Sequence, residues 1–91
     1  MSRYMWDPEK ARVNLAKHGV PFEEAKTVPD TGLAHWVPDP RFPHEDRFLI
    51  TGPSTFGHLL VVVTSERGPR PRIISARRAT KRERDAYEAR P

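Results

Sequence analysis

The run Leu59–Val63 is the feature that most limits what this chain can fold into. All of its residues are apolar, and the last three are valines. A strand that alternates apolar and polar residues turns one face to water, whereas a strand that is apolar at every position has no such face. The run therefore predicts a central strand that is buried on both faces.

The flanking sequence supplies neighbouring strands. We predict strands over 33–37, 47–52, 58–65 and 72–77. A proline-rich loop at 39–46 and turns at 53–57 and 66–70 separate these four strands from one another. Connections this short join neighbouring strands in opposite directions, so the strands should form an antiparallel meander.

Helix signals precede the predicted sheet. Asp7 is a suitable N-cap, and Pro8 suits the first helical position. Gly19 is a natural stop, so the first helix should run to about His18. A second, short helix is expected over 21–28.

Two further elements complete the predicted order. Residues 3–6 suit a short strand, and Thr80 and Glu83 have the spacing of a capping box that opens a last helix. Trp6 and Trp36 are expected in the core or at an interface, with stacking on nucleic-acid bases as the functional alternative. The order is β-α-α-β-β-β-β-α, which describes one α+β domain over residues 1–91.

Composition excludes several classes of protein. The chain has no cysteine, which excludes disulfides, zinc–thiolate sites and thiol nucleophiles. No apolar run approaches the roughly 20 residues of a membrane span, and residues 1–10 lack the apolar centre of a signal peptide. We therefore expect an intracellular, cytoplasmic protein.

The positive charge is concentrated in the last quarter of the chain. Residues 1–65 carry seven Lys or Arg and eight Asp or Glu, a net charge of −1, whereas residues 66–91 carry nine and four, a net charge of +5. A local positive field attracts polyanions, of which nucleic acid is the commonest in a cell. A solvated basic tail that aids solubility would have the same composition, so charge alone leaves both interpretations open.

Several segments of the sequence resemble one known family. The pattern "WD…K…N…KHG…F…EA", followed by "HEDRF", "LLVVVTSERG" and "RIISARRATKRERDAYE", is similar to the BrnT toxins of type II toxin–antitoxin pairs. The resemblance extends over almost the whole chain, and the closing segment is its most specific part. It implies a fold like that of the RelE-like ribonucleases and an endoribonuclease that cleaves mRNA with no metal or other cofactor.

The resemblance also implies partners. These are an RNA substrate and a ribbon-helix-helix antitoxin of the BrnA type, which neutralises the toxin and represses the operon. Operator DNA would be reached only through the antitoxin, and a homodimer could form within the toxin–antitoxin complex. No membrane partner is expected.

Cleavage of RNA without a metal requires three chemical roles. A base takes the proton of the 2′-hydroxyl, cations stabilise the charge that develops on the phosphate, and an acid protonates the leaving 5′-oxygen. Arginine suits the second role because its planar fork donates two parallel hydrogen bonds to phosphate oxygens. The candidates for catalytic roles are His18, Glu66, Arg67, Arg77, Arg78 and Tyr87.

Other basic residues are candidates for binding the RNA backbone. They are Lys10, Lys17, Arg70, Arg72, Lys81 and Arg84. Lys10, Asn14 and Lys17 share one helical stripe, which could face either phosphates or water.

Most of these candidates also have a structural explanation. Histidine changes charge near neutral pH, which favours His18 as an acid or base, but a histidine in a last helical turn can simply bond local carbonyls. Glu66 could be a base or the ion-pair partner of Arg67. Tyr87 could pack the last helix onto the sheet, and Glu83, on the same helical stripe, could only complete the capping box. The other histidines (His35, His44 and His58) are isolated, and no spacing in the sequence supports a metal site.

The predicted hairpin of the last two strands separates two groups of arginines. Tight pairing places Arg77 beside about Leu60 and leaves Arg67 at the other end, roughly 15–20 Å away at about 3.3 Å per residue. Arg77 and Arg78 should point to opposite faces of the sheet, so we expect one of the two to be structural. The sequence does not say which.

The hypothesis that best fits these observations is a RelE-like ribonuclease toxin of the BrnT type. A basic subunit without catalytic activity, acting with its antitoxin as a co-repressor on operator DNA, is the alternative. An RNA-binding scaffold with no partner encoded nearby is a third possibility. RNA fragments formed with turnover distinguish the enzyme from the binding proteins.

Overall fold

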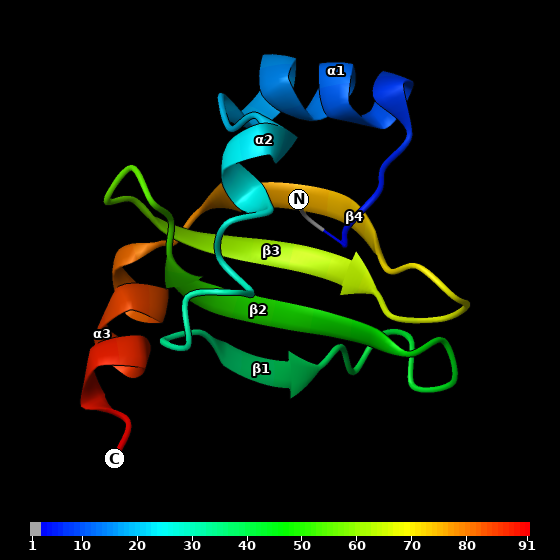
Figure 1. Ribbon diagram of the computed structural model, residues 1–91. Helices are drawn as coiled ribbons and strands as arrows, with labels where there is room; N and C mark the ends of the chain where they lie inside the picture. The colour runs from blue at the N-terminus through cyan, green and yellow to red at the C-terminus, as the bar shows by residue number, and fades with distance from the viewer. Residues whose placement is uncertain (1–2) are drawn as a thin grey trace.

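The computed structural model describes residues 3–91 and contains one four-stranded antiparallel sheet. Its strands lie in chain order: β1 (His35–Pro38), β2 (Arg47–Pro53), β3 (Leu59–Ser65) and β4 (Arg72–Arg78) (Figure 1). The predicted meander is therefore confirmed. The predicted burial of β3 is confirmed as well, since Leu60 and Val62 are fully buried and Val61, on the opposite face, is 4% exposed.

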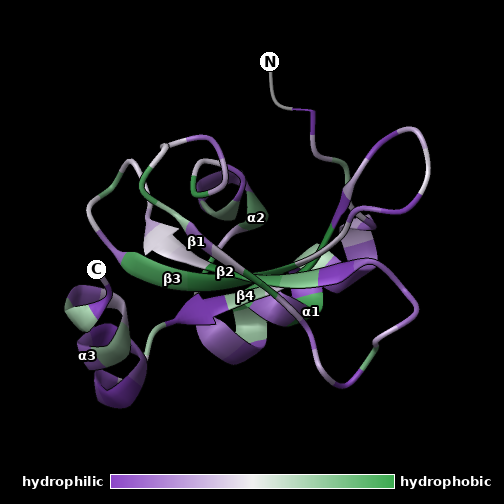
Figure 2. Cartoon of the chain, turned by 90° about the horizontal axis from the view of Figure 1, so that it is seen from below, coloured by the Kyte–Doolittle hydropathy of each residue, from purple (hydrophilic) through white to green (hydrophobic). Residues whose placement is uncertain are grey.

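Three helices accompany the sheet: α1 (Pro8–His18), α2 (Phe22–Ala25) and α3 (Lys81–Ala89). Helices α1 and α2 lie over one face, which we call the helix-covered face (Figure 1). The core forms between them and the inward residues of the strands, and it includes Phe22 of α2, Ile50 of β2 and Leu60 of β3. Helix α3 lies at one end of the sheet and has no buried residue (Figure 2). The predicted α+β class and element order agree with this arrangement.

The predicted helix ends are formed by local hydrogen bonds. The Asp7 carboxylate accepts a hydrogen bond from the Glu9 backbone N–H, and Gly19 ends α1 in the left-handed region at φ 71°. Thr80 and Glu83 make both halves of the capping box at the start of α3. Each signal involves residues at most three positions apart, which explains why the sequence alone predicted them.

Two predicted elements are shorter than expected. The strand expected at 3–6 is a single parallel bridge between Met5 and Arg72, because the chain turns away at Asp7 to cap α1. The second helix has four residues rather than eight. After it, the N–H groups of Thr27 and Val28 bond to carbonyls three residues back, which tightens the backbone into turns.

A β-bulge in β4 decides which way its last residues point. The register shifts between Val63 and Thr64 of β3, and Ile74 is the extra residue on β4. Arg77 is therefore opposite Val61, one position from the predicted neighbour, and Arg78 is opposite Leu60. Because a shift of one residue exchanges the two faces of a strand, Arg78 joins the helix-covered face and Arg77 the opposite face.

Candidate active site

Arg77 is held by the helix that follows it. Its guanidinium donates two hydrogen bonds to the Glu83 carboxylate, at 2.6 and 2.7 Å, and a weaker one to the carbonyl of Arg78. These hydrogen bonds lower the pKa of Glu83 to about 2, against the opposing effect of partial burial. Of the two adjacent arginines, Arg77 is thus the one with an evident structural role, since it fastens α3 to the end of β4.

The pKa of Glu83 leads to a prediction about acid stability. A folded-state pKa near 2, below the ordinary value of 4.5, means that this carboxylate stabilises the fold fully above about pH 4.5 and progressively less as the pH falls toward 2. Glu83→Gln keeps a capping group but loses the ion pair, and should lower the free energy of unfolding by about 0.5–1 kcal/mol at pH 7, since both side chains remain partly exposed.

Urea denaturation at several pH values measures this effect. The difference between the wild type and Glu83→Gln should shrink from pH 7 to pH 2, whereas Glu88→Gln, an exposed neighbour on α3, should show little difference at any pH. A difference for Glu83→Gln that stays constant down to pH 2 would contradict the ion-pair explanation.

Arg78 has a different environment. It is exposed, and its Nη2 lies 3.1 Å from Nε2 of His58. On the other side of the ring, Nδ1 of His58 lies 2.8 Å from Oε2 of Glu24, and the Ser54 hydroxyl donates to the same oxygen at 2.7 Å. The side chain of Glu24 is 6% exposed and that of His58 is 37% exposed. We call Glu24, His58 and Arg78 the relay, because they form a chain from the interior to the surface.

One protonation state satisfies every contact in the relay. A protonated Nδ1 donates to the Glu24 carboxylate, and an unprotonated Nε2 accepts from the guanidinium of Arg78, which can only donate. The outer nitrogen of His58 therefore carries a lone pair beside a fixed positive charge. The lone pair of His58 can take a proton, and the guanidinium of Arg78 can bind an anion at the same place on the surface.

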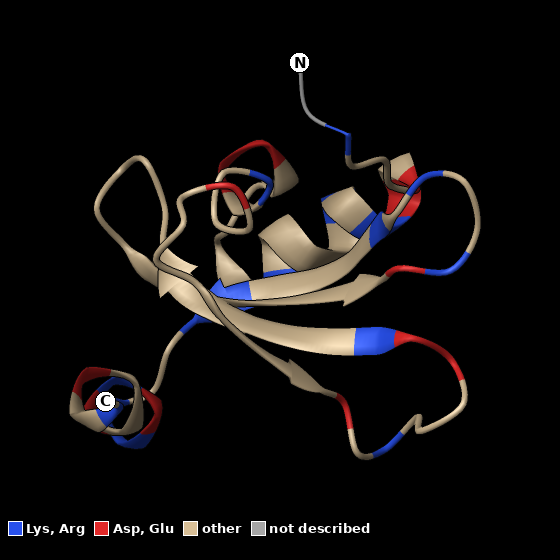
Figure 3. Cartoon of the chain, turned by 60° about the horizontal axis from the view of Figure 1, so that its bottom comes forward, with Lys and Arg blue, Asp and Glu red and all other residues tan. Residues whose placement is uncertain are grey.

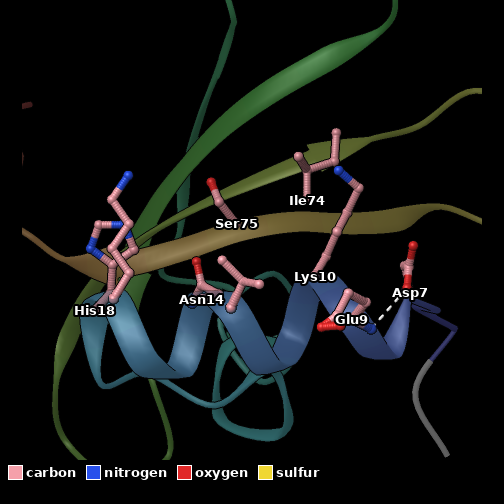
Figure 4. Close-up of a pocket in the computed structure, with 9 residues that line it drawn as sticks. Asp7, Glu9, Lys10, Asn14, His18, Ile74 and Ser75 are labelled. Atoms are coloured by element: carbon pink, nitrogen blue, oxygen red, sulfur yellow. Dashed lines mark hydrogen bonds between the residues drawn. The ribbon is translucent and has the colours of Figure 1, made fainter.

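A groove of about 500 Å³ runs between α1 and β4 (Figure 4). Lys10, Lys17 and His18 line it from α1, and Ile74 and Ser75 line it from β4. Both elements run in the same direction, so the His18 end of the groove leads toward the end of β4 where Arg78 lies (Figure 1). The structure thus places three of the predicted residues, Lys10, Lys17 and His18, along one groove.

Asn14 is not part of an exposed polar stripe, so neither predicted alternative, a stripe that faces phosphates or one that faces water, applies to it. Lys10 and Lys17 on the same helix are exposed. Asn14 is 6% exposed, and its amide bonds the carbonyls of Val20 and Ala76 and the N–H of Ala76. The side chain therefore joins α1 to the backbone of β4. Its role in the structure is to hold the groove together.

The remaining arginines of the hairpin lie at the far end of the sheet. Arg67, Arg70 and Arg72 surround the turn between β3 and β4, and Figure 3 shows basic segments at both ends of the sheet. Arg67 donates to the carbonyl of His44. The register therefore confirms that Arg67 and Arg77 do not share one pocket.

Glu66 is not the ion-pair partner of Arg67 in this structure. Its carboxylate accepts hydrogen bonds from the hydroxyls of Tyr4 and Thr64, at 3.2 and 2.7 Å, and pairs with Arg3. Burial and the adjacent Glu66 carboxylate raise the pKa of Tyr4 far above its usual range. These contacts tie the start of the chain to the end of β3.

The polar groups of α3 serve mainly to attach the helix. The Tyr87 hydroxyl donates to the carbonyl of Leu33 at 2.6 Å, which attaches α3 to the segment before β1, whereas Lys81 pairs with Asp85 within the helix itself. Arg84 is exposed. The two tryptophans are partly buried against the core, as expected: Trp6 packs edge-on to Phe22, and Trp36 to Phe48.

Sequence reasoning missed His58 and Glu24. The sequence shows His58 as an isolated histidine because its partner Glu24 is 34 positions away, at no recognisable spacing. Within residues 3–91, no group of three or more His, Asp or Glu side chains comes together as a metal site would require. None of the helices over the same range is long and apolar enough to span a membrane.

Comparisons with known proteins agree with the fold and with the predicted resemblance. A family model described as "Ribonuclease toxin, BrnT, of type II toxin-antitoxin system" matches residues 6–83. The structure is also similar to the 1.1 Å crystal structure of the Brucella abortus ribonuclease toxin BrnT, with 25% sequence identity and a TM-score of 0.68, over 86% of this chain and 96% of that chain. A comparison with curated protein sequences found no match.

Proposed function

Because this chain belongs to the BrnT family of ribonuclease toxins of type II toxin–antitoxin systems, we propose that it is a metal-independent endoribonuclease that cleaves mRNA in the cytoplasm. The observation that carries the proposal is the contact between Arg78 and His58 at the surface. A guanidinium that can hold a phosphate and an imidazole that can move a proton are two of the three groups that metal-free cleavage needs.

The proposed path of the RNA follows the groove between α1 and β4. Lys10 and Lys17 would contact phosphates on one side of the scissile bond, and His18 lies where the groove leads toward the relay. Arg77 and Arg78 form a basic corner where β4 leads into α3, and Lys81 and Arg84 of α3 would extend the basic surface past this corner. The far end of the hairpin, with Arg67, Arg70 and Arg72, would add affinity through further phosphates without taking part in the chemistry.

The contacts described above change the roles proposed for the other candidates. Arg77 would act by holding α3 beside the site, because its fork is already engaged by Glu83. Glu66 and Tyr87 are likewise engaged in tying segments of the chain together. We therefore propose these three residues as supports of the site, with Arg78 as the residue that contacts the reacting phosphate.

A cleavage assay with excess EDTA tests the proposal. The purified protein should cut total RNA into fragments with turnover, at a rate within about twofold of that without EDTA, because the chemistry uses only imidazole and guanidinium groups. Loss of cleavage in EDTA that Mg²⁺ or Mn²⁺ restores would contradict the metal-independent mechanism. Gel shifts of RNA or operator DNA without fragments would instead favour the co-repressor alternative.

Membership of the family implies an antitoxin partner, and we propose that it is a ribbon-helix-helix protein of the BrnA type. A segment with a net charge of +5 should be covered by an acidic element of the antitoxin, which orders as it binds. Operator DNA would then be contacted only through the antitoxin, and two toxin chains could be held in one complex. In the same assay, an equimolar amount of antitoxin should stop cleavage.

A further inference from the structure

We propose that His58 is the general base of the ribonuclease reaction and that Glu24 positions it. The inference rests on the proposed ribonuclease function and adds to it the residue that moves the proton. No motif in the sequence marks either residue. The assignment comes from the relay alone, in which a buried carboxylate, an imidazole and an exposed guanidinium contact one another in series.

The first step of the argument concerns the orientation of the imidazole. Oε2 of Glu24 contacts Nδ1 of His58 at 2.8 Å and also accepts the hydroxyl of Ser54. The oxygen of Ser54 in turn accepts the N–H of His58, so the serine connects the carboxylate to the backbone of the histidine. With Nδ1 engaged inside the protein, Nε2 is the nitrogen that faces the surface, where its contact is with the exposed Arg78, and it is the nitrogen placed to exchange protons with a substrate.

The second step concerns the substrate. Arg78 Nη2 lies 3.1 Å from that Nε2, so a phosphate bound by the exposed guanidinium would be in contact with the imidazole edge. In RNA the 2′-hydroxyl is adjacent to the 3′-phosphate. The proton to be removed and the charge to be stabilised therefore lie within one nucleotide. The two groups that would act on them, Nε2 of His58 and the guanidinium of Arg78, are likewise in contact with each other.

The reaction balances as an internal transesterification. Nε2 of His58 takes the proton of the 2′-hydroxyl, whose oxygen forms a bond to phosphorus as the bond from phosphorus to the 5′-oxygen breaks. Arg78 stabilises the negative charge on the phosphate oxygens in the transition state, in which five oxygens surround the phosphorus. The 5′-oxygen takes a proton from water, and the imidazolium returns its proton to solvent. The products are a 2′,3′-cyclic phosphate and a 5′-hydroxyl.

A purely structural role would also explain the contact between Glu24 and His58, since a buried carboxylate requires partners. The two explanations differ in what a change of side chain does. His58→Asn places an amide N–H near the position of Nδ1, so it keeps the partner of Glu24 but removes the titrating nitrogen. Glu24→Gln keeps a hydrogen-bonding side chain but removes the negative charge beside the ring.

The experiment measures single-turnover cleavage of a defined RNA oligonucleotide between pH 5 and 9 with saturating full-length protein. His58→Asn should reduce the rate roughly 100- to 10,000-fold with RNA affinity and thermal midpoint near those of the wild type, since general-base catalysis contributes about that much. His44→Asn, an exposed histidine outside the site, should retain the wild-type rate.

Glu24→Gln provides a measurement that does not alter His58. The charged groups that contact the imidazole are Glu24 from α2 and Arg78 from β4. Loss of the carboxylate removes the charge that stabilises the imidazolium, so the rising limb of the pH–rate profile should move to lower pH. If His58→Asn unfolds, this profile decides the question by itself, because a purely structural carboxylate would leave the limb unmoved.

Other outcomes overturn the inference. Cleavage by His58→Asn at the wild-type rate, while the wild type still cleaves RNA in EDTA, would remove His58 from the mechanism and leave the proposed function intact. So would a loss of the rising limb in His18→Asn that His58→Asn does not show. Absence of RNA cleavage by the wild type would overturn both the inference and the proposed function.

Discussion

Arg78→Ala should reduce RNA cleavage by at least roughly 100- to 1,000-fold, which is the usual effect of removing one donor that stabilises the transition state. The thermal midpoint should change little, because Arg78 is exposed and its guanidinium contacts Nε2 of His58 at the surface. Arg78→Lys should bind RNA almost as tightly as the wild type but cleave it slowly, since lysine keeps the charge and loses the bidentate fork.

Arg77→Ala is the matched control, because it removes the same side chain from the adjacent position. It should lower the thermal midpoint and loosen α3, since Arg77 holds Glu83 through two hydrogen bonds, and the chemical step should be much less affected than in Arg78→Ala. Single-turnover rates and thermal unfolding of both variants provide the comparison. If both cleave RNA at rates near that of the wild type, the corner is not the active site.

The site hypothesis also differs from simple electrostatic affinity. If the corner only attracted RNA, each arginine substitution would weaken binding by a similar amount and lower the salt dependence by about 0.7 per lost contact with a single strand. Lysine would then replace arginine well at either position. A drop in rate without a drop in affinity in Arg78→Lys therefore supports a role in the transition state.

Asn14→Ala should produce the largest loss of stability among polar substitutions in α1. Strand β4 is an edge strand, and the amide of Asn14 satisfies both backbone groups of Ala76 on its open side. A third bond goes to the carbonyl of Val20. Each buried backbone group left without a partner costs about 1–3 kcal/mol, so we expect the free energy of unfolding to fall by about 3 kcal/mol or more.

Chemical denaturation measures this loss, and Lys17→Ala provides the control on the same helix. The side chain of Lys17 is exposed, so its removal should change the free energy of unfolding by less than about 0.5 kcal/mol. A loss below about 1 kcal/mol for Asn14→Ala would mean that water replaces the amide at β4, and the proposed support of the groove would not hold.

Much of the fold could be predicted from the sequence because its signals are local. The caps of α1 and α3 involve Asp7, Gly19, Thr80 and neighbours within four positions. The apolar run of β3 and the short turns on either side of it determine a meander with that strand inside. The concentration of arginines at the end of β4 was visible for the same reason.

The candidate site was predicted only in part. The sequence identified both arginines of the corner and showed that they alternate, but it could not assign their faces. That assignment depends on the bulge at Ile74, without which Arg77 would lie opposite Leu60 on the helix-covered face. No residue type within 73–75 indicates a bulge, because a bulged and a regular β4 differ in how the whole strand packs and not in their local sequence.

The sequence by itself determined most of the elements, their order, the antiparallel sheet and the basic corner, since each depends on neighbours along the chain. The tertiary structure alone decided which side chains meet: His58 with Glu24 across 34 positions, and Asn14 with Ala76 across 62. No spacing along the sequence predicts such contacts between a carboxylate, an amide or an imidazole and its partner. These groups are brought together by the packing of α1 and α2 on the sheet, which is a property of the folded chain.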